Sequence, residues 1–157
     1  MYSIYLTRHG RCESPDNVSK KGIVELGIIK EQLDKLKFNA TTALFSKANR
    51  CKETSLFLAP HAIQYELKCL AGGTNATLTK RMNEVVSTIL QFKNQDILVV
   101  THDNAPLIYG LRLAELFGAH INWENALEES FRNNIDQGEG ILVCGTSYKK
   151  LMYKNPH

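Results

Sequence analysis

The sequence contains no apolar run that approaches the roughly 20 residues of a membrane-spanning helix. Its cysteines are far apart and form no Cys-x-x-Cys pair, which argues against a zinc site or a dithiol redox site. The net charge is only +3 and the basic residues are scattered, so we expect no nucleic-acid partner. We also expect no membrane association. No basic segment precedes an apolar stretch at the N-terminus, so we expect no signal peptide and a cytoplasmic location with reduced thiols.

The sequence shows no internal repeat and no low-complexity stretch, and residues 1–157 are expected to form one domain. Short apolar runs alternate with helical patterns, which predicts a three-layer α/β/α fold with a mostly parallel central sheet. Expected strands lie at 2–7, 41–45, 63–67 and 97–100, with a terminal hairpin from 141–144 and 149–153. Helices are expected from Ser19 to Leu36, over 48–58, over 78–89, and from Pro106 to Gly118, whereas 121–134 is ambiguous.

The tripeptide Arg8-His9-Gly10 stands where the first expected strand ends. Histidine supplies a neutral nitrogen nucleophile near pH 7, and arginine presents a planar fork of donors that matches phosphate oxygens. Glycine allows the backbone to turn sharply and to approach a ligand. These residue types in this order indicate a site that binds a phosphoryl group and attacks it.

Two other strand ends carry related chemistry. Ser46 and Arg50 follow the second strand, and His102 and Asp103 follow the buried run 97–100. Ligands bind at the carboxyl ends of parallel strands, so these residues are expected to meet His9 at one edge of the sheet. The alternatives are a structural role for His9, a core position for His102 and surface ion pairs for Arg8 and Arg50. Ser46 is also a candidate cap for its own helix.

The motifs together resemble the histidine phosphatase superfamily, which includes the cofactor-dependent phosphoglycerate mutases. The similarity covers nearly the whole chain and rests on 6–10, 18–22, 45–54 and 99–102, although Lys47 replaces a usual proline. The resemblance implies the phosphoglycerate mutase-like fold, a phosphorylated substrate and no metal or cofactor. It implies His9, His102, Arg8 and Arg50 as catalytic residues, with Arg8, His9, Gly10, Arg50 and His102 binding phosphate.

Within the superfamily, the chain most resembles the small SixA-type phosphohistidine phosphatases. It is short, and residues 67–74 contain no carboxylate where the superfamily has its general-acid glutamate. An imidazole leaving group needs less protonation than an alkoxide, so the missing acid favours phosphohistidine as substrate. Asp103 is either a general acid, as in the acid-phosphatase branch, or a cap for the next helix.

The leading hypothesis is therefore a phosphatase that forms a covalent phosphohistidine and acts on protein phosphohistidine. The alternatives are a small-molecule phosphomonoester phosphatase, a mutase, which the missing acid and covering segments disfavour, and a binding module without turnover. For an enzyme with two histidines in its site, activity is expected to depend on pH around neutrality.

Overall fold

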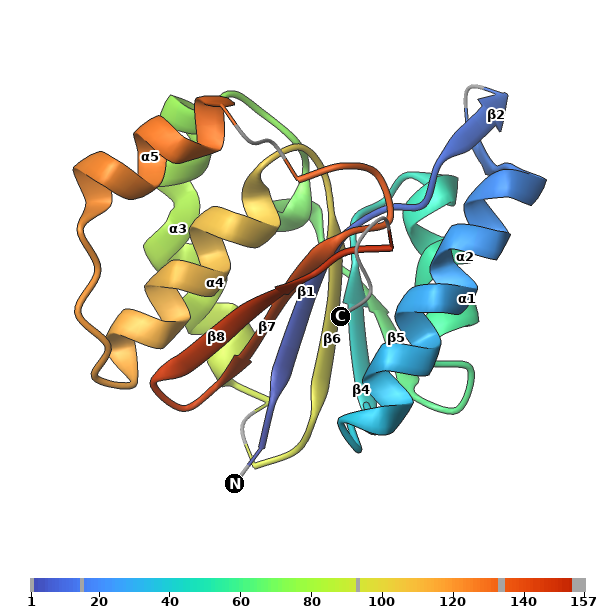
Figure 1. Cartoon of the computed structure of the whole chain (residues 1–157), viewed down its shortest axis with the longest axis horizontal. Helices are drawn as coiled ribbons and strands as arrows, with labels where there is room; N and C mark the ends of the chain where they lie inside the picture. The colour runs from blue at the N-terminus through green and yellow to red at the C-terminus, as the bar shows by residue number, and fades with distance from the viewer. Residues whose placement is uncertain (1, 15, 93, 133–134, 154–157) are drawn as a thin grey trace.

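The computed structural model describes residues 2–14, 16–92, 94–132 and 135–153 of the chain. A six-stranded sheet in the order β5-β4-β6-β1-β7-β8 forms its middle layer (Figure 1). The strands β5, β4, β6 and β1 run parallel, and β7 and β8 complete the sheet as an antiparallel hairpin. The strand bounds are β1 Ile4–Arg8, β4 Thr42–Phe45, β5 Ile63–Glu66, β6 Ile97–Thr101, β7 Gly140–Cys144 and β8 Ser147–Leu151.

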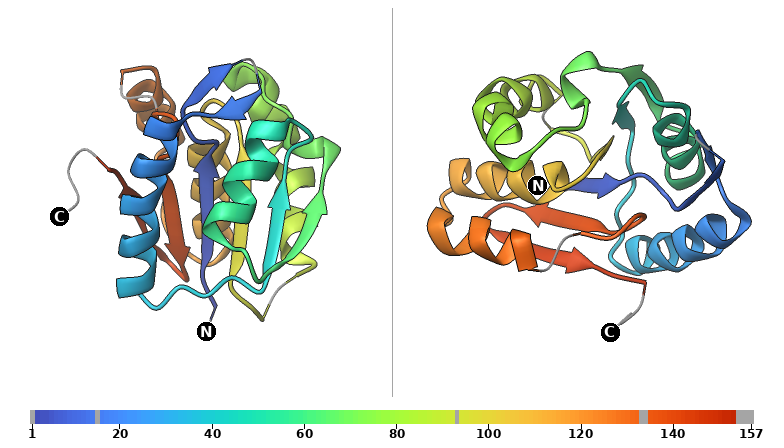
Figure 2. Two further views of the ribbon diagram at one scale, coloured as in Figure 1. Left: turned by 90° about the vertical axis from the view of Figure 1, so that its right-hand side faces the viewer. Right: turned by 90° about the horizontal axis from the view of Figure 1, so that it is seen from above.

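Helices cover both faces of this sheet (Figure 2). Their bounds are α1 Lys20–Lys35, α2 Asn49–Leu58, α3 Asn75–Leu90, α4 Ala105–Leu116 and α5 Trp123–Arg132. α1 and α2 pack on one face, where Tyr5 and Leu98 belong to the core, and α3 and α4 pack on the other, where Ile4 and Val99 do. The predicted three-layer α/β/α arrangement with a mostly parallel sheet is confirmed.

The central strand β6 shows why the two cores form. All five of its residues are buried, and the four from Ile97 to Val100 alternate between the two hydrophobic clusters, as expected of a parallel strand covered on both sides. β6 lies between β1 and β4, so the segments after these three strands meet at one edge of the sheet.

The predicted element ends are largely correct. Ser19 caps α1 by accepting a hydrogen bond from the Gly22 N–H at 3.0 Å, and Gly118 follows α4 with a left-handed φ of 112°. The predicted second arm of the hairpin, 149–153, is placed two residues too late, because β8 begins at Ser147. The ambiguous stretch contains α5, and its residues 133–134 lie outside the described residues.

Three short elements were not predicted: the 3-10 helix η1 (Lys68–Leu70) and the strands β2 (Cys12–Ser14) and β3 (Asn17–Val18). β2 and β3 pair with each other as a separate small sheet between β1 and α1. In the described part of the chain, no helix has the length and apolar character needed to cross a membrane.

Candidate active site

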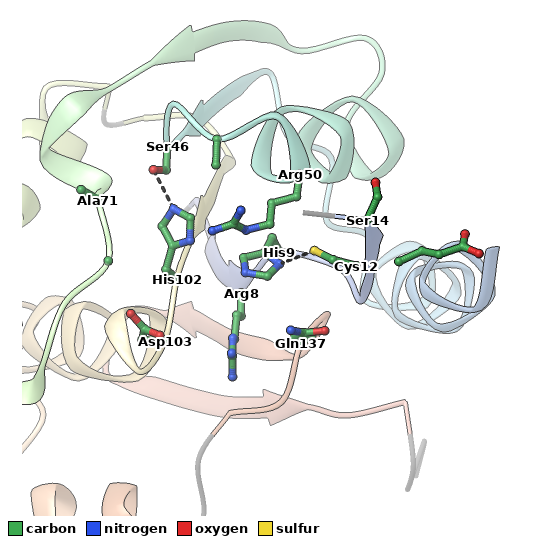
Figure 3. A pocket seen from close by; sticks show the side chains of 13 residues that line it. Arg8, His9, Cys12, Ser14, Ser46, Arg50, Ala71, His102, Asp103 and Gln137 are labelled. Carbon is green, nitrogen blue, oxygen red and sulfur yellow. Dashed lines mark hydrogen bonds between the residues drawn. The ribbon is translucent and has the colours of Figure 1, made fainter. Parts of the chain in front are cut away.

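A cavity of about 800 Å³ opens at the carboxyl ends of β1, β4 and β6 (Figure 3). The sheet register places these ends side by side: Arg8 pairs with Thr101, and Phe45 pairs with Val100. The cavity is lined by most of the site residues that the sequence predicts, namely Arg8, His9, Arg50, His102 and Asp103, and also by Ser46.

His9 follows β1 and is only 5% exposed. Its Nδ1 lies 3.0 Å from the Gly10 carbonyl oxygen, and since a carbonyl only accepts, Nδ1 carries the proton. The other ring nitrogen, Nε2, is then unprotonated, and it faces the cavity (Figure 3). Burial, and then the positive charges of Arg50 and Arg8, lower the pKa of His9 from 6.5 to about 4. His9 therefore presents a free nitrogen lone pair at neutral pH.

His102 follows β6, and its ring meets that of His9 edge to face at a centroid distance of 5.3 Å. Its Nε2 is 2.8 Å from the Ser46 hydroxyl and 3.6 Å from the Cys51 sulfur. The other ring nitrogen points towards His9 and Arg50 (Figure 3). Burial, and then the charge of Arg50, lower the pKa of His102 as well.

Arg8 and Arg50 are the only lysine or arginine side chains among the described residues that line the cavity. Arg8 donates from Nη1 to the Ile135 carbonyl at 2.9 Å, whereas its buried Nε has no hydrogen-bond partner among the described residues. Arg50 comes from the first turn of α2 and contacts Asp16 at 3.6 Å through Nη1. The predicted ion pair and the predicted cavity position of Arg50 thus occur together. Two guanidinium groups beside two imidazoles suit an oxyanion with several acceptor oxygens.

Gly10 is predicted to bind phosphate, but its geometry assigns it another role. Its N–H donates to Thr54 Oγ1 at 2.9 Å, and it does not line the cavity. A Cβ at Gly10 would come within 2.8 Å of the Leu26 side chain, so glycine is needed for packing there. Thr54 Oγ1 also donates to the Arg50 carbonyl at 2.7 Å and so links the turn after His9 to α2.

Two predicted helix caps are wrong. Asp103 does not cap α4: the capping position is Asn104, and the Asp103 carboxylate accepts from the Gly73 N–H at 3.0 Å. Ser46 does not cap α2, whose capping position is Ala48, because its hydroxyl is bonded to His102. Both side chains contact residues that are distant in sequence, which local capping rules do not take into account.

Seven further residues line the cavity that the sequence analysis does not name as site residues: Cys12, Glu13, Ser14, Ala48, Ala71, Gly72 and Gln137. Gln137 belongs to a turn before β7 that supports the nucleophile, since Gly138 donates its N–H to the His9 carbonyl at 2.8 Å. The left-handed φ of 83° at Gly138 explains the glycine. The only sequence signal for this turn is a pair of glycines, Gly138 and Gly140, just before an apolar run.

A charged cluster behind the cavity fixes the same turn. The buried Glu25 carboxylate pairs with Arg11 at 2.9 Å, and Arg11 also donates to the Tyr153 hydroxyl at 2.6 Å. Tyr153 in turn donates to Asp136 at 2.9 Å, next to Gln137. A buried carboxylate is stable only when it is paired, so this cluster holds α1, the segment after β1 and the turn before β7 together.

No group of three or more His, Cys, Asp or Glu side chains in residues 2–14, 16–92, 94–132 and 135–153 has the arrangement of a metal site. The side chains that line the cavity present imidazole, guanidinium, hydroxyl and carboxylate groups.

No family model matches the sequence, and no curated protein matches it. Several solved structures share its fold. The protein histidine phosphatase SixA, complexed with tungstate, superposes with a TM-score of 0.66 at 13% identity, over 97% of this chain and 97% of SixA. The α-ribazole phosphatase from Shigella flexneri gives a TM-score of 0.64 at 15% identity, covering 96% of this chain and 95% of its own.

The phosphoglycerate mutase from Plasmodium falciparum is also similar, with a TM-score of 0.60 at 22% identity over 98% of this chain and 84% of the mutase. All three similarities extend over nearly the whole of this chain. The resemblance predicted from the motifs is confirmed at the level of the fold: the chain has the fold of the SixA-type histidine phosphatases and the phosphoglycerate mutases.

Proposed function

We propose that the protein is a metal-independent phosphatase that transfers the phosphoryl group of its substrate to His9. The observation that carries this proposal is the state of the His9 ring. Its Nδ1–H is bonded to Gly10, and its unprotonated Nε2 faces a cavity with two guanidinium groups. The fold similarity to enzymes named as phosphatases supports the same conclusion.

The chemistry takes two steps. In the first, the Nε2 lone pair of His9 bonds to phosphorus while the bond to the leaving group breaks, and the leaving group departs with the electron pair and takes up a proton. In the second, a water oxygen bonds to phosphorus and gives up a proton to solvent, the P–N bond breaks, and Nε2 regains its lone pair. Arg8, Arg50 and His102 stabilise the negative charge on the phosphoryl oxygens in both steps.

The preferred substrate class is protein phosphohistidine. Ala48, Ala71 and Gly72 line the cavity with small groups, so a bulky leaving group such as a protein surface has access. Among the described residues, Arg8 and Arg50 are the only lysines or arginines that line the cavity. If both bind the phosphoryl group, no further cation of this kind is left to bind the carboxylate of a sugar acid. Residues 67–74 contain no carboxylate that could act as the general acid, which favours a leaving group as good as imidazole.

A small-molecule phosphomonoester phosphatase is the second candidate, because two carboxylates, Glu13 and Asp103, line the cavity. Either could protonate an alkoxide if it reached the leaving group. A binding module without turnover is the third candidate, motivated by Lys47 in place of proline. Lys47 is exposed, and Arg50 still lines the cavity three residues later.

A comparison of leaving groups tests these candidates. We expect kcat/KM for phosphoramidate, a phosphohistidine peptide and p-nitrophenyl phosphate to exceed that for phosphoserine by about two to four decades, the usual contribution of a general acid. Glu13→Gln should leave this ratio unchanged. Efficient phosphoserine hydrolysis that is lost in Glu13→Gln would instead indicate a phosphomonoesterase with Glu13 as its acid. Phosphate binding without turnover of any substrate would indicate the binding module.

We also propose that the protein is located in a reducing cytoplasm and meets its substrate there. All four cysteines are free thiols. Burial raises the pKa of Cys12, the thiol nearest to His9, and so keeps it protonated and weakly reactive at neutral pH.

A further inference from the structure

The segment 70–74, from the last residue of η1 to the residue before α3, is here called the rim loop and forms one wall of the cavity. It contributes Ala71 and Gly72 to that wall. This is the segment in which the family resemblance places a general acid, and none of its five residues has a titratable side chain. The part of the rim loop that lines the cavity, Ala71 and Gly72, therefore presents only backbone and a methyl group to it.

Polar contacts fasten the rim loop at three nearby points. The Leu70 carbonyl accepts from Thr101 Oγ1 at 2.6 Å, and the Gly72 carbonyl accepts from Arg81 Nη2 at 3.0 Å. The Gly73 N–H donates to Asp103 Oδ2 at 3.0 Å. Two of these contacts come from Thr101 and Asp103, the neighbours of His102. The rim loop and His102 are thereby connected through both sides of the histidine.

Within the rim loop, Gly72 lies directly against His102 and Asp103. A Cβ there would stand 2.7 Å from Asp103 Oδ2 and 3.0 Å from the Cβ of His102, so only glycine fits without displacement. Asp103 itself has a left-handed φ of 55°, a conformation that non-glycine residues adopt rarely. A strained backbone conformation persists only where surrounding contacts maintain it. The hydrogen bond between the Asp103 carboxylate and the Gly73 N–H is such a contact.

We propose that Asp103 and Arg81 anchor the rim loop against His102, and that Asp103 is a positioning residue and not the proton donor. The Oδ2 atom of Asp103 accepts from the Gly73 N–H, and the guanidinium of Arg81 donates to the Gly72 carbonyl of the same peptide unit. The segment in which the family resemblance places a general acid thus presents backbone to the cavity, and Asp103 and Arg81 hold that backbone in place. This inference rests on the proposed function for its catalytic consequence, but the anchoring itself can be tested without turnover.

Four variants of the full-length chain separate the roles. Asp103→Asn keeps an oxygen that can accept from Gly73 but removes a transferable acid proton, whereas Asp103→Ala removes both. Arg81→Met removes the second anchor. Lys80→Met is the matched control, because Lys80 is the exposed neighbour of Arg81 on α3.

The first measurement is hydrogen exchange of the Gly73 amide, followed by NMR. Asp103→Ala and Arg81→Met should accelerate this exchange about tenfold or more, as expected when a hydrogen bond to a charged group is lost, whereas Asp103→Asn and Lys80→Met should not. Unchanged exchange in both Asp103→Ala and Arg81→Met would overturn the anchoring, whether or not the protein proves to be a phosphatase.

The second measurement is steady-state kinetics with p-nitrophenyl phosphate and phosphoserine. A displaced rim loop should raise KM for both substrates in Asp103→Ala and Arg81→Met, while Asp103→Asn keeps the ratio of their kcat/KM values within about threefold of wild type. A selective loss of phosphoserine hydrolysis in Asp103→Asn, with disappearance of the basic limb of the pH profile, would assign Asp103 as the general acid and overturn the proposal. Failure of the wild type to hydrolyse any substrate would refute the proposed function and leave the exchange result to decide the anchoring.

Discussion

The floor and the rim of the cavity are built in different ways. The floor consists of side chains that directly follow β1, β4 and β6: His9, Ser46 and His102 are only 5%, 4% and 9% exposed. Their backbones continue the sheet pairing, since His9 donates its N–H to Thr101 and Ser46 donates its N–H to Val100, both at 3.1 Å. The positions of the floor groups are therefore fixed by the sheet.

The rim is held by contacts between side chains and loops. Asp103 and Arg81 fasten the rim loop, and Asp16 of the turn between β2 and β3 pairs with Arg50 while its side chain is 53% exposed. Exposed ion pairs contribute little stability, so the rim is less rigidly defined than the floor. Under the proposed function, the floor would carry the reaction and the rim would influence which leaving group the cavity accepts. Changes in the floor should accordingly have larger effects than changes in the rim.

The largest effect is expected for the nucleophile. His9→Ala removes the nitrogen that receives the phosphoryl group, and kcat should fall by about four decades or more. Wild-type protein, quenched during turnover of labelled substrate, should carry an acid-labile, base-stable label on His9 that the variant lacks. Turnover by His9→Ala at the wild-type rate would show that the floor does not act as a nucleophilic site.

The arginines come next. Arg8→Ala and Arg50→Ala should each lower kcat/KM by about two to three decades, as for the loss of a transition-state donor. Arg112→Ala is the matched control, because Arg112 pairs with Glu115 on α4 and does not line the cavity. Thermal melting should show that the variants remain folded. Near-full activity of either variant would show that this arginine is a surface residue without a role in the reaction.

The floor was largely predictable from the sequence, and the rim was not. Apolar runs such as 97–100 mark buried parallel strands, and parallel strands bring their ends together, so His9 and His102 could be placed at one site. The rim depends on pairs such as Arg81 with Gly72, in which neither residue has a periodic pattern or a motif. The β2–β3 pair is only three and two residues long, too short for strand alternation to be recognised. Asp103 was assigned as a cap or an acid because its bond to Gly73 links segments distant in sequence.

The pH dependence of kcat/KM tests whether the two histidines of the floor are shielded from solvent, in contrast to the exposed rim. The sequence predicts titration near neutrality, but burial and the neighbouring arginines lower the pKa of His9 to about 4 and also lower that of His102. The nucleophile loses its lone pair only when the pH falls through the folded-state value, so the acid limb of kcat/KM should lie well below 6.5. NMR titration of the two imidazoles checks this, with midpoints that belong to the coupled pair. Midpoints at 6.5 would mean that the floor is solvated.

The same shift has a consequence for stability. Because the folded-state pKa of His9 is lower than the unfolded value, the unfolded chain binds more protons between pH 6.5 and about 4. The contribution of His9 is therefore fully present above the unfolded pKa, and Tm should decline as the pH falls through this window. The decline should be smaller in His9→Asn. An equal decline in that variant would attribute the effect to other groups.

The smallest effect is expected at the rim, for the carboxylate that contacts Arg50. Asp16 Oδ1 lies 3.6 Å from Arg50 Nη1, close enough to compete with a phosphoryl oxygen for the guanidinium. Since exposed pairs are worth about 0.2–1 kcal/mol, Asp16→Asn should tighten the binding of inorganic phosphate about two- to threefold at low salt. The gain should diminish at high salt, where the charge of Asp16 is screened. Asp34→Asn, an exposed carboxylate on α1, is the control for net charge. Weaker phosphate binding in Asp16→Asn, measured by calorimetry, would mean that Asp16 positions Arg50 for its ligand and that this part of the rim belongs functionally to the floor.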